Sequence, residues 1–385
     1  SMRIMNKIID RYILKEIAFP FFMILFILTF VLLMGKILQL MDLMVNKGIR
    51  VTDIALLVMY LMPSFLLFTI PISLFVAIMM GLGRLSGDNE LLVLKAAGLS
   101  LHRLARPILV AVAACFLLTA LTSYYLAPQG NFAVKTLLFD MARQKASAGI
   151  KEKVFNDEFS GILLYADRVP VSGEHMEGVL ISDTRNTAEQ RTIIAERAYL
   201  VADPRAMTVT LRLENGATHS VDRNLNNYRR MDFGRYDLKL DFGAAMAGDA
   251  EKTKASTEMT VGEMVRRMRD KKLKDEDLRE LAIEINKKFS IPFSTLVFGI
   301  LGIPLGIRKH RTVKYWGFTI GLAVVITYYL LRLGGEALAE TGRLTPFIGA
   351  WAPNIILGVA GIWLFVRAAA EKPLWTGFRG RRAGA

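Results

Sequence analysis

Six long stretches without a charged side chain constrain this chain more than any other feature of its sequence. Each stretch has between 17 and 30 residues. A helix of about 20 residues crosses the hydrocarbon core of a bilayer, which is about 30 Å thick. The sequence therefore predicts six transmembrane helices, three on each side of a long insert. The stretches cover residues 17–35, 54–83, 107–134, 289–307, 315–331 and 344–366.

The composition agrees with a membrane protein, since 53% of the 385 residues are hydrophobic and only 22% are charged. The single cysteine, Cys115, excludes an internal disulfide framework, a cysteine-based zinc site and an iron–sulfur cluster. Only four histidines are present, and no two of them have the spacing of metal ligands on one helix. We therefore expect this chain to bind no metal ion or other cofactor.

Lysine and arginine residues lie mainly on one side of the predicted membrane. The amino-terminal segment, the loops after the second and fourth stretches and the carboxy-terminal tail hold 17 of them, whereas the short loops on the other side hold five. Because cytoplasmic loops carry this excess, we expect both termini in the cytoplasm and the insert outside it. The net charge of +14 then reflects topology, and we expect no nucleic acid partner.

The insert, residues 135–288, has the pattern of an all-β domain. Eight short apolar or β-branched runs follow one another between residues 154 and 242, separated mainly by glycine and polar residues. Such runs are typical of a sandwich or jelly roll, here of about 100 residues. Asn215-Gly216 predicts a hairpin turn, and residues 260–288 predict an amphipathic stalk that returns to the fourth stretch. The same pattern is compatible with a β domain that binds no ligand.

The loop after the second stretch predicts a short helix at about residues 86–98. Glu90 stands where a helix start favours negative charge, Gly98 ends the helix, and Ser100 can cap the next one. A permease that is driven by a separate ATPase needs such a helix on its cytoplasmic face. The alternative without a coupling role is a helix at the membrane interface whose acidic side chain is simply exposed to water. Another interfacial helix is predicted at residues 8–17.

Motifs for enzymatic catalysis are absent from the sequence. It contains no phosphate-binding loop G-x-x-x-x-G-K-[ST], no G-x-S-x-G and no H-E-x-x-H. We therefore expect a non-hydrolytic protein whose ATP hydrolysis, if any, takes place in a partner. The six stretches also lack the acidic groups that ion-coupled carriers keep near mid-membrane, which disfavours an ion-driven carrier.

Several segments together resemble one family of membrane permeases. With the three-plus-three arrangement around a β insert, they make nearly the whole chain similar to the lipopolysaccharide export permeases LptF and LptG. The later segments resemble the LptF branch more than the LptG branch. The similar segments are residues 10–13 (DRYI), 83–91 (GRLSGDNEL), 97–100 (AGLS), 127–130 (APQG), 335–338 (GEAL) and 350–354 (AWAPN).

The resemblance implies an α-helical polytopic protein of the bacterial inner membrane with an inserted periplasmic jellyroll-like domain. The expected parts are residues 1–134 with three transmembrane helices, residues 135–288 with the β domain, and residues 289–385 with three more helices and a basic tail. Family members pair as LptF-like and LptG-like permeases and bind two copies of the ATPase LptB, which uses ATP and magnesium. They pass lipopolysaccharide towards the bitopic protein LptC and the periplasmic bridge LptA.

The resemblance also assigns a role to the short cytoplasmic helix. By match to the family, Glu90 is expected to contact an arginine in a groove of the ATPase. Asp88, Leu91 and Leu94 belong to the same segment and are expected to take part in this coupling. The alternative role of Glu90 is a charge that stabilises the start of its own helix.

Basic side chains near the outer membrane surface are the candidates for substrate binding. Lys36 and Lys135 match positions where the family carries basic residues towards lipid phosphates, and an ammonium group binds phosphate as a compact charge. Lys47, Arg50 and Arg332 are weaker candidates, chosen by position alone. Lysines at these places are equally compatible with snorkelling to the headgroup level.

The alternative functions differ in what the insert would bind. If the insert carries lipid, inward apolar side chains such as Leu163, Tyr165 and Ile181 would shelter the acyl chains from water. The runner-up function is a scaffold that transmits movement to a periplasmic protein partner and binds no glycolipid. A third function, an ion-driven secondary carrier, would need no ATPase.

Overall fold

The computed structural model separates most of the helices from a β-sheet. The first unit consists of Ser1–Asn131 with Ala255–Ala385, and the second unit is Phe132–Lys254. The structure describes residues 2–47, 51–149, 152–159, 161–170, 175–185, 189–203, 208–222, 228–240, 254–270, 273–307 and 316–370.

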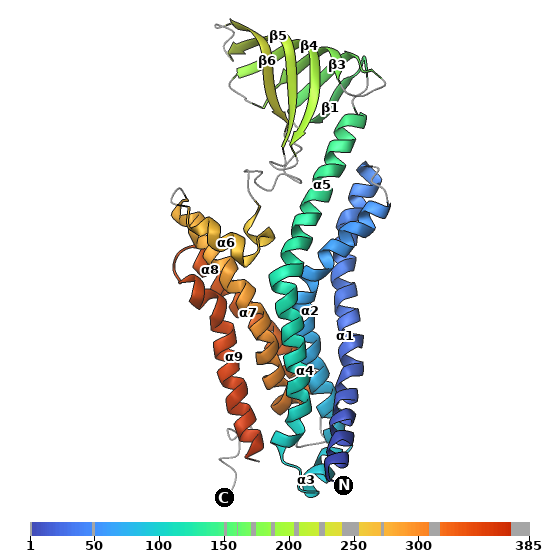
Figure 1. Cartoon of the computed structure of the whole chain (residues 1–385), viewed down its shortest axis with the longest axis vertical. Helices are drawn as coiled ribbons and strands as arrows, with labels where there is room; N and C mark the ends of the chain where they lie inside the picture. The colour runs from blue at the N-terminus through green and yellow to red at the C-terminus, as the bar shows by residue number, and fades with distance from the viewer. Residues whose placement is uncertain are drawn as a thin grey trace, which may run out of the picture. The chain divides into compact units, whose positions relative to one another are not determined.

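Among the residues that the structure describes, six helical segments are long and apolar enough to cross a membrane, which confirms the predicted number. The third segment contains η1, a π-helical turn at Thr122–Leu126, and continues as a helix on both sides of it. Figure 1 shows α1, α2, α4, α7, α8 and α9 side by side. The segments are α1 (Met2–Lys47), α2 (Val51–Gly87), α4 (Leu101–Leu121) with α5 (Ala127–Gly149), α7 (Asp275–Gly306), α8 (Trp316–Glu340) and α9 (Pro346–Ala369).

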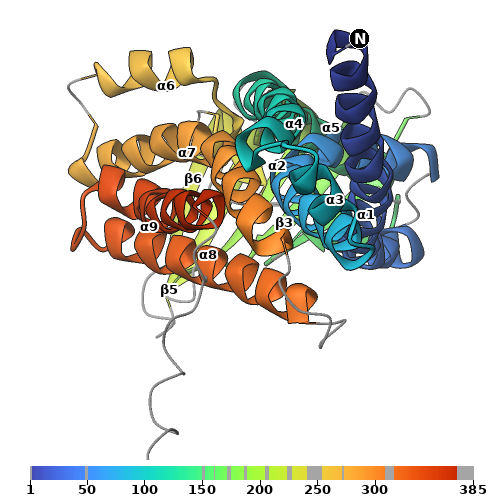
Figure 2. The ribbon, with the colours of Figure 1, turned by 90° about the horizontal axis from the view of Figure 1, so that it is seen from below.

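Helices α2 and α7 form the centre of the bundle. Of the residues in their most apolar windows, 61% and 67% are buried, against 22% for α1 and 17% for α8. Leu74, Ile78 and Leu82 of α2 pack in one cluster with Val112 of α4 and Ile303 of α7. Figure 2, seen along the helices, shows α1 and α8 at the outside of the bundle. These two helices therefore expose apolar surface that suits lipid or a partner protein.

Glycines allow α8 and α9 to touch through their backbones. A Cβ atom added at Gly349 would lie 2.6 Å from the Gly335 carbonyl oxygen and 2.9 Å from the Ala339 Cβ. A Cβ atom at Gly335 would collide with the Gly349 carbonyl oxygen. Small residues permit such close approach between membrane helices, where dispersion contacts replace the hydrophobic effect as the source of stability.

Two helical regions differ from the expected boundaries. Helix α1 runs from Met2 to Lys47 without a break, so residues 8–17 form part of it and not a separate interfacial helix. The expected stalk at 260–288 is divided into α6 (Val261–Met268) and the first part of α7, and Met264 of α6 packs against Leu281. A polar amphipathic pattern predicts a helix, but it does not predict whether that helix continues into the next apolar one.

The insert contains the predicted β domain, with helical segments at both of its ends. Six strands pair in chain order as one open antiparallel sheet, visible in Figure 1. The sheet has fewer and longer strands than expected, because four of the eight predicted runs merge into two strands. It also pairs sequence neighbours throughout, unlike the crossing strand order of a jelly roll. The strands are β1 (Phe155–Phe159), β2 (Ile162–Arg168), β3 (Met176–Asp183), β4 (Glu189–Asp203), β5 (Thr208–Asp222) and β6 (Tyr228–Leu240).

The predicted hairpin at Asn215-Gly216 is wrong, because both residues lie inside β5. Asn215 has a positive φ of 52°, and its side-chain amide donates a hydrogen bond to Glu196 of β4 at 3.0 Å. Gly216 pairs with Ala195 on one side and Phe233 on the other, and a Cβ atom there would collide with the Ile194 carbonyl oxygen. The dipeptide lies within a long strand whose pairing with β4 and β6 keeps one register on both sides of it, although it was expected to end a short strand.

We predict that Gly335→Ala lowers the thermal stability of the purified protein in detergent. The added methyl group forces α8 away from α9, which costs about 1–3 kcal/mol by comparison with other overpacked sites. Gly334→Ala is the matched control, since a Cβ atom at Gly334 has nothing within 4 Å. Alanine there is expected to leave the melting temperature unchanged or to raise it slightly, because alanine favours helix. Equal melting temperatures for the two variants would contradict the close contact.

Candidate functional site

A short helix lies where the sequence predicted it, between α2 and α4. Helix α3 spans Glu90–Ala96 and lies at the end of the bundle where α1 begins and α9 ends (Figure 1). Asn89 precedes it with a positive φ of 60°, and Gly98 follows it with a φ of 86°. Ser100 caps α4 by accepting a hydrogen bond from the Arg103 backbone amide at 3.3 Å, which confirms the predicted cap. Two tight turns thus hold α3 as a separate element.

Helix α3 is amphipathic with one face against the bundle. Leu91 is only 5% exposed, and Leu94 packs against the same hydrophobic cluster. Leu92 and Val93, in contrast, are each 66% exposed. The two leucines chosen from the sequence therefore seat the helix, whereas the outward apolar side chains are two residues that the sequence analysis missed. The i, i+3 spacing groups Leu91 with Leu94, but it does not show which face turns inward.

The Glu90 side chain is bonded to α1. The Tyr12 hydroxyl donates a hydrogen bond to Glu90 Oε2 at 2.6 Å. Asp88, the other acidic residue proposed for this segment, is 57% exposed and lies 3.7 Å from the Arg84 guanidinium. Figure 2 shows α3 beside α1 and α2 at this end of the bundle.

Two ion pairs tie the flanks of α3 to the first turns of α1. Arg84, in the last turn of α2, contacts Glu16 at 2.5 Å. Arg103, in the first turn of α4, contacts both carboxylate oxygens of Asp10, at 2.9 and 3.0 Å. Together with the contact between Tyr12 and Glu90, these ion pairs connect α1 to the end of α2, to α3 and to the start of α4. The partners are 68 to 93 residues apart in the sequence, so no local pattern predicts them.

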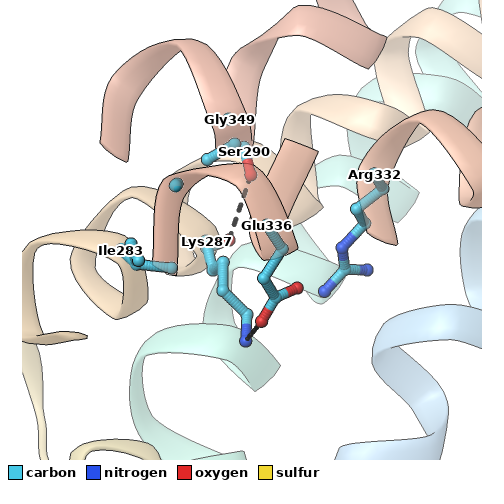
Figure 3. A pocket seen from close by; sticks show the side chains of 8 residues that line it. Ile283, Lys287, Ser290, Arg332, Glu336 and Gly349 are labelled. Atoms are coloured by element: carbon cyan, nitrogen blue, oxygen red, sulfur yellow. Dashed lines mark hydrogen bonds and ion pairs between the residues drawn. The ribbon is translucent and has the colours of Figure 1, made fainter. Parts of the chain in front are cut away.

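A second polar group lies inside the helical bundle, between α7 and α8 (Figure 3). The Lys287 ammonium lies 3.1 Å from Glu284 on its own helix and 2.5 Å from Glu336 on α8. All three side chains are less than a quarter exposed. Charges in such a position are stable when they are paired, and their removal leaves an uncompensated partner.

Arg332 lies one helical turn before Glu336 and belongs to the same group. It is 9% exposed and its guanidinium stacks over the Phe68 ring of α2 at 5.1 Å. The group surrounds a small cavity with room for about one water molecule. Position alone predicted Arg332, whereas no local pattern predicted its acidic neighbours, because Lys287 of α7 and Glu336 of α8 come together only in the fold. The cavity is lined by Ile283, Lys287, Ser290, Arg332, Glu336, Ala339, Gly349 and Ala350.

The other basic candidates for substrate binding differ in exposure and in whether the structure describes their side chains. Lys36 is exposed on α1, and Lys135 is half-buried on α5 in the second unit. Lys47 is the last residue of α1, but its side chain lies outside the described part of the structure, as does the whole of Arg50. No contact in the described residues tests the role of these four side chains in substrate binding.

The three candidates in the β domain do not share one face of the sheet. Leu164 pairs with Ile181 across β2 and β3, so these two side chains point the same way, and both are buried. Leu163 and Tyr165 alternate with Leu164 and therefore point to the opposite face. The buried face holds Ile162, Leu164, Ala166, Val179, Ile181, Ile193, Ala195, Leu211, Leu213 and Leu238.

Comparison with known proteins gives one consistent family. The chain matches the model of the lipopolysaccharide export system permease LptF/LptG over residues 11–367. It is 20% identical over 352 residues to the lipopolysaccharide export system permease protein LptF of Escherichia coli K12, across 91% of this chain and 92% of that protein. It is 24% identical over 362 residues to the uncharacterized protein RP871 of Rickettsia prowazekii, across 92% and 98% of the two chains. The matched region contains α3, the polar group and the β-sheet.

We predict that Lys287→Glu destabilises the bundle and that the exchange Lys287→Glu with Glu336→Lys restores much of the loss. The single change leaves three carboxylates together, and breaking a buried pair costs about 3–5 kcal/mol. The exchange again places one cation beside two carboxylates. Thermal unfolding of the purified protein measures both, with the exposed Arg343→Glu as a control. The pairing is contradicted if the exchange is no more stable than the single variant.

Proposed function

Because the chain belongs to the lipopolysaccharide export system permease family LptF/LptG, we propose that it is the LptF-like half of a transporter driven by a separate ATPase. Membership makes it a permease subunit and not a hydrolase, and its six apolar helices agree with an inner-membrane protein. In this proposal the chain pairs with an LptG-like permease, and the two together extract lipopolysaccharide from the membrane. Both termini and α3 face the cytoplasm, in line with the excess of basic residues on that side.

The observation that carries the proposal is the outward face of α3. Leu92 and Val93 are exposed apolar side chains on a helix that is otherwise seated in the bundle, and Glu90 starts that helix. An apolar pair beside a carboxylate suits a groove with apolar walls and a cationic group. In the proposed complex this groove belongs to an LptB-like ATPase, present in two copies for the two permeases. ATP and magnesium are used there, and this chain needs no cofactor of its own.

Basic side chains away from α3 serve the substrate in this proposal. Lys36 lies on α1, far along the helix from the end that contacts α3, and Lys135 lies on α5. Both would bind phosphate groups of lipopolysaccharide, with Arg332, Lys47 and Arg50 as further candidates. Each cation adds to the attraction for a multiply phosphorylated lipid, because an ammonium or guanidinium group forms charge-assisted hydrogen bonds with phosphate.

The β domain is proposed to continue the path in the periplasm. Its buried apolar face, which includes Ile181, suits acyl chains, whereas Leu163 and Tyr165 lie on the other face. Within the described residues, β1 and β6 are the edge strands of the sheet, and such edges suit continuation of the sheet into a partner. LptC-like and LptA-like proteins are the expected partners at these edges.

We predict that Leu92→Ala with Val93→Ala weakens binding of the ATPase to the permease by about tenfold or more. Each truncation removes apolar area that the complex would bury, at about 25 cal/mol per Å². Binding is measured between the purified permease pair in nanodiscs and the labelled ATPase. Val154→Ala, an exposed apolar residue of the second unit, serves as the control. Unchanged affinity in the double variant would contradict the docking role of α3.

We predict that Lys36→Gln with Lys135→Gln lowers lipopolysaccharide binding several-fold and makes the remaining binding less sensitive to salt. Loss of two charges removes the part of the attraction that salt screens. Lys15→Gln is a control on the same helix as Lys36, near the opposite end. The role in substrate binding fails if the double variant and the control bind lipopolysaccharide equally at low and high salt.

A further inference from the structure

Tyr12 is the side chain that connects Glu90 to the membrane helices. Its hydroxyl is 2.6 Å from Glu90 Oε2, although 78 residues separate the two in sequence. Tyr12 is 39% exposed and Glu90 is half-buried, so both side chains are partly accessible at the end of the bundle. Nothing in the proposed function assigns a role to this tyrosine.

The neighbouring cations are directed elsewhere. Arg84 contacts Glu16 at 2.5 Å and lies 3.7 Å from Asp88, and Arg103 contacts Asp10. The hydrogen-bond partner that Glu90 has in the described structure is therefore a neutral hydroxyl. A neutral donor fixes the direction of a carboxylate and leaves its negative charge in place. A guanidinium would fix the direction too, but it would also neutralise the charge.

One carboxylate oxygen of Glu90 remains for a second partner. Oε2 accepts from Tyr12, and this is the hydrogen bond that Glu90 forms within the described residues. A carboxylate that is held through one oxygen presents the other in a narrow range of directions. Such an arrangement favours a cationic group that arrives from outside the chain, because less side-chain freedom is lost on binding.

We propose that Tyr12 is a positioning residue, which holds the Glu90 carboxylate ready for a cationic group of the ATPase and links that contact to α1. This inference rests on the proposed function of α3. Helix α1 continues without interruption from Tyr12 to Lys36, a distance of about 36 Å at 1.5 Å per residue. Movement of α3 is thereby passed directly to the helix that carries a substrate candidate.

A double-mutant cycle tests the inference. Tyr12→Phe, Glu90→Ala and the combination of both are placed in the full permease pair in nanodiscs, and the dissociation constant of the ATPase is measured for each. Tyr12→Phe removes only the hydroxyl and is expected to weaken binding about 3- to 10-fold, as for loss of one hydrogen bond. In the Glu90→Ala background the same change is expected to have no further effect, because the hydroxyl acts through the carboxylate.

Two controls separate positioning from general damage. Tyr125→Phe removes a hydroxyl from an exposed tyrosine of η1 and is expected to leave ATPase binding unchanged. The melting temperature of Tyr12→Phe is expected to match that of the parent protein, since the ring remains in place. A lowered melting temperature together with weakening in both backgrounds would assign Tyr12 a structural role and overturn the inference.

The remaining outcomes distinguish this inference from the proposed function. If Glu90→Ala weakens binding and Tyr12→Phe does not, Glu90 acts without Tyr12, and only the inference fails. If the effects of the two changes add, Tyr12 acts independently of Glu90, and again the inference fails alone. If Glu90→Ala leaves binding unchanged, the coupling role of Glu90 fails and the inference fails with it.

Discussion

The bundle depends on one constraint, which is that polar groups in the hydrocarbon core must find their partners within the protein. The backbone meets it by forming helices, and side chains meet it in pairs at helix contacts. Asn354 of α9 accepts a hydrogen bond from the Tyr328 hydroxyl at 3.1 Å and donates one to the Ser290 carbonyl at 2.7 Å. Lys287, which lies just outside the fourth uncharged stretch but is largely buried in the bundle, pairs in the same way with two carboxylates. Close packing at glycines adds the dispersion contacts that hold apolar helices together in lipid.

At the end of the bundle where α3 lies, water is available and the contacts are of another kind. Ion pairs and one tyrosine hydroxyl connect α1 to the end of α2, to α3 and to the start of α4. Exposed ion pairs contribute little stability each, so their value lies in the geometry that they define together. A helix seated by Leu91 and held at both flanks is attached firmly to the helices around it. In the proposed function, this attachment converts a push on α3 into movement of α1.

Local sequence patterns predicted the elements well where length and polarity decide the structure. Uncharged stretches predicted the six long helices, and Ser100 predicted the start of α4. They failed where one pattern has two structural solutions. Asn-Gly suits a hairpin turn, but here it lies within a continuous strand, where the Asn215 side chain donates a hydrogen bond to Glu196 on the neighbouring strand. The alternation of Leu163 and Leu164 predicted two faces of β2 but not which of them is buried.

The sequence by itself determined the number of membrane helices, the position of the short helix and the β nature of the insert, because these depend on neighbours within one or two turns or strands. Only the tertiary structure decided that Leu92 and Val93 face outward and that Tyr12 holds Glu90. It also decided that Lys287 forms an ion pair with Glu336 close to Arg332. Each of these facts depends on which distant segment packs against a helix. The spacing of side chains along one helix or strand is a local property. The partner that pairs with a charge or accepts a hydrogen bond can come from a distant segment, and only the fold brings it close.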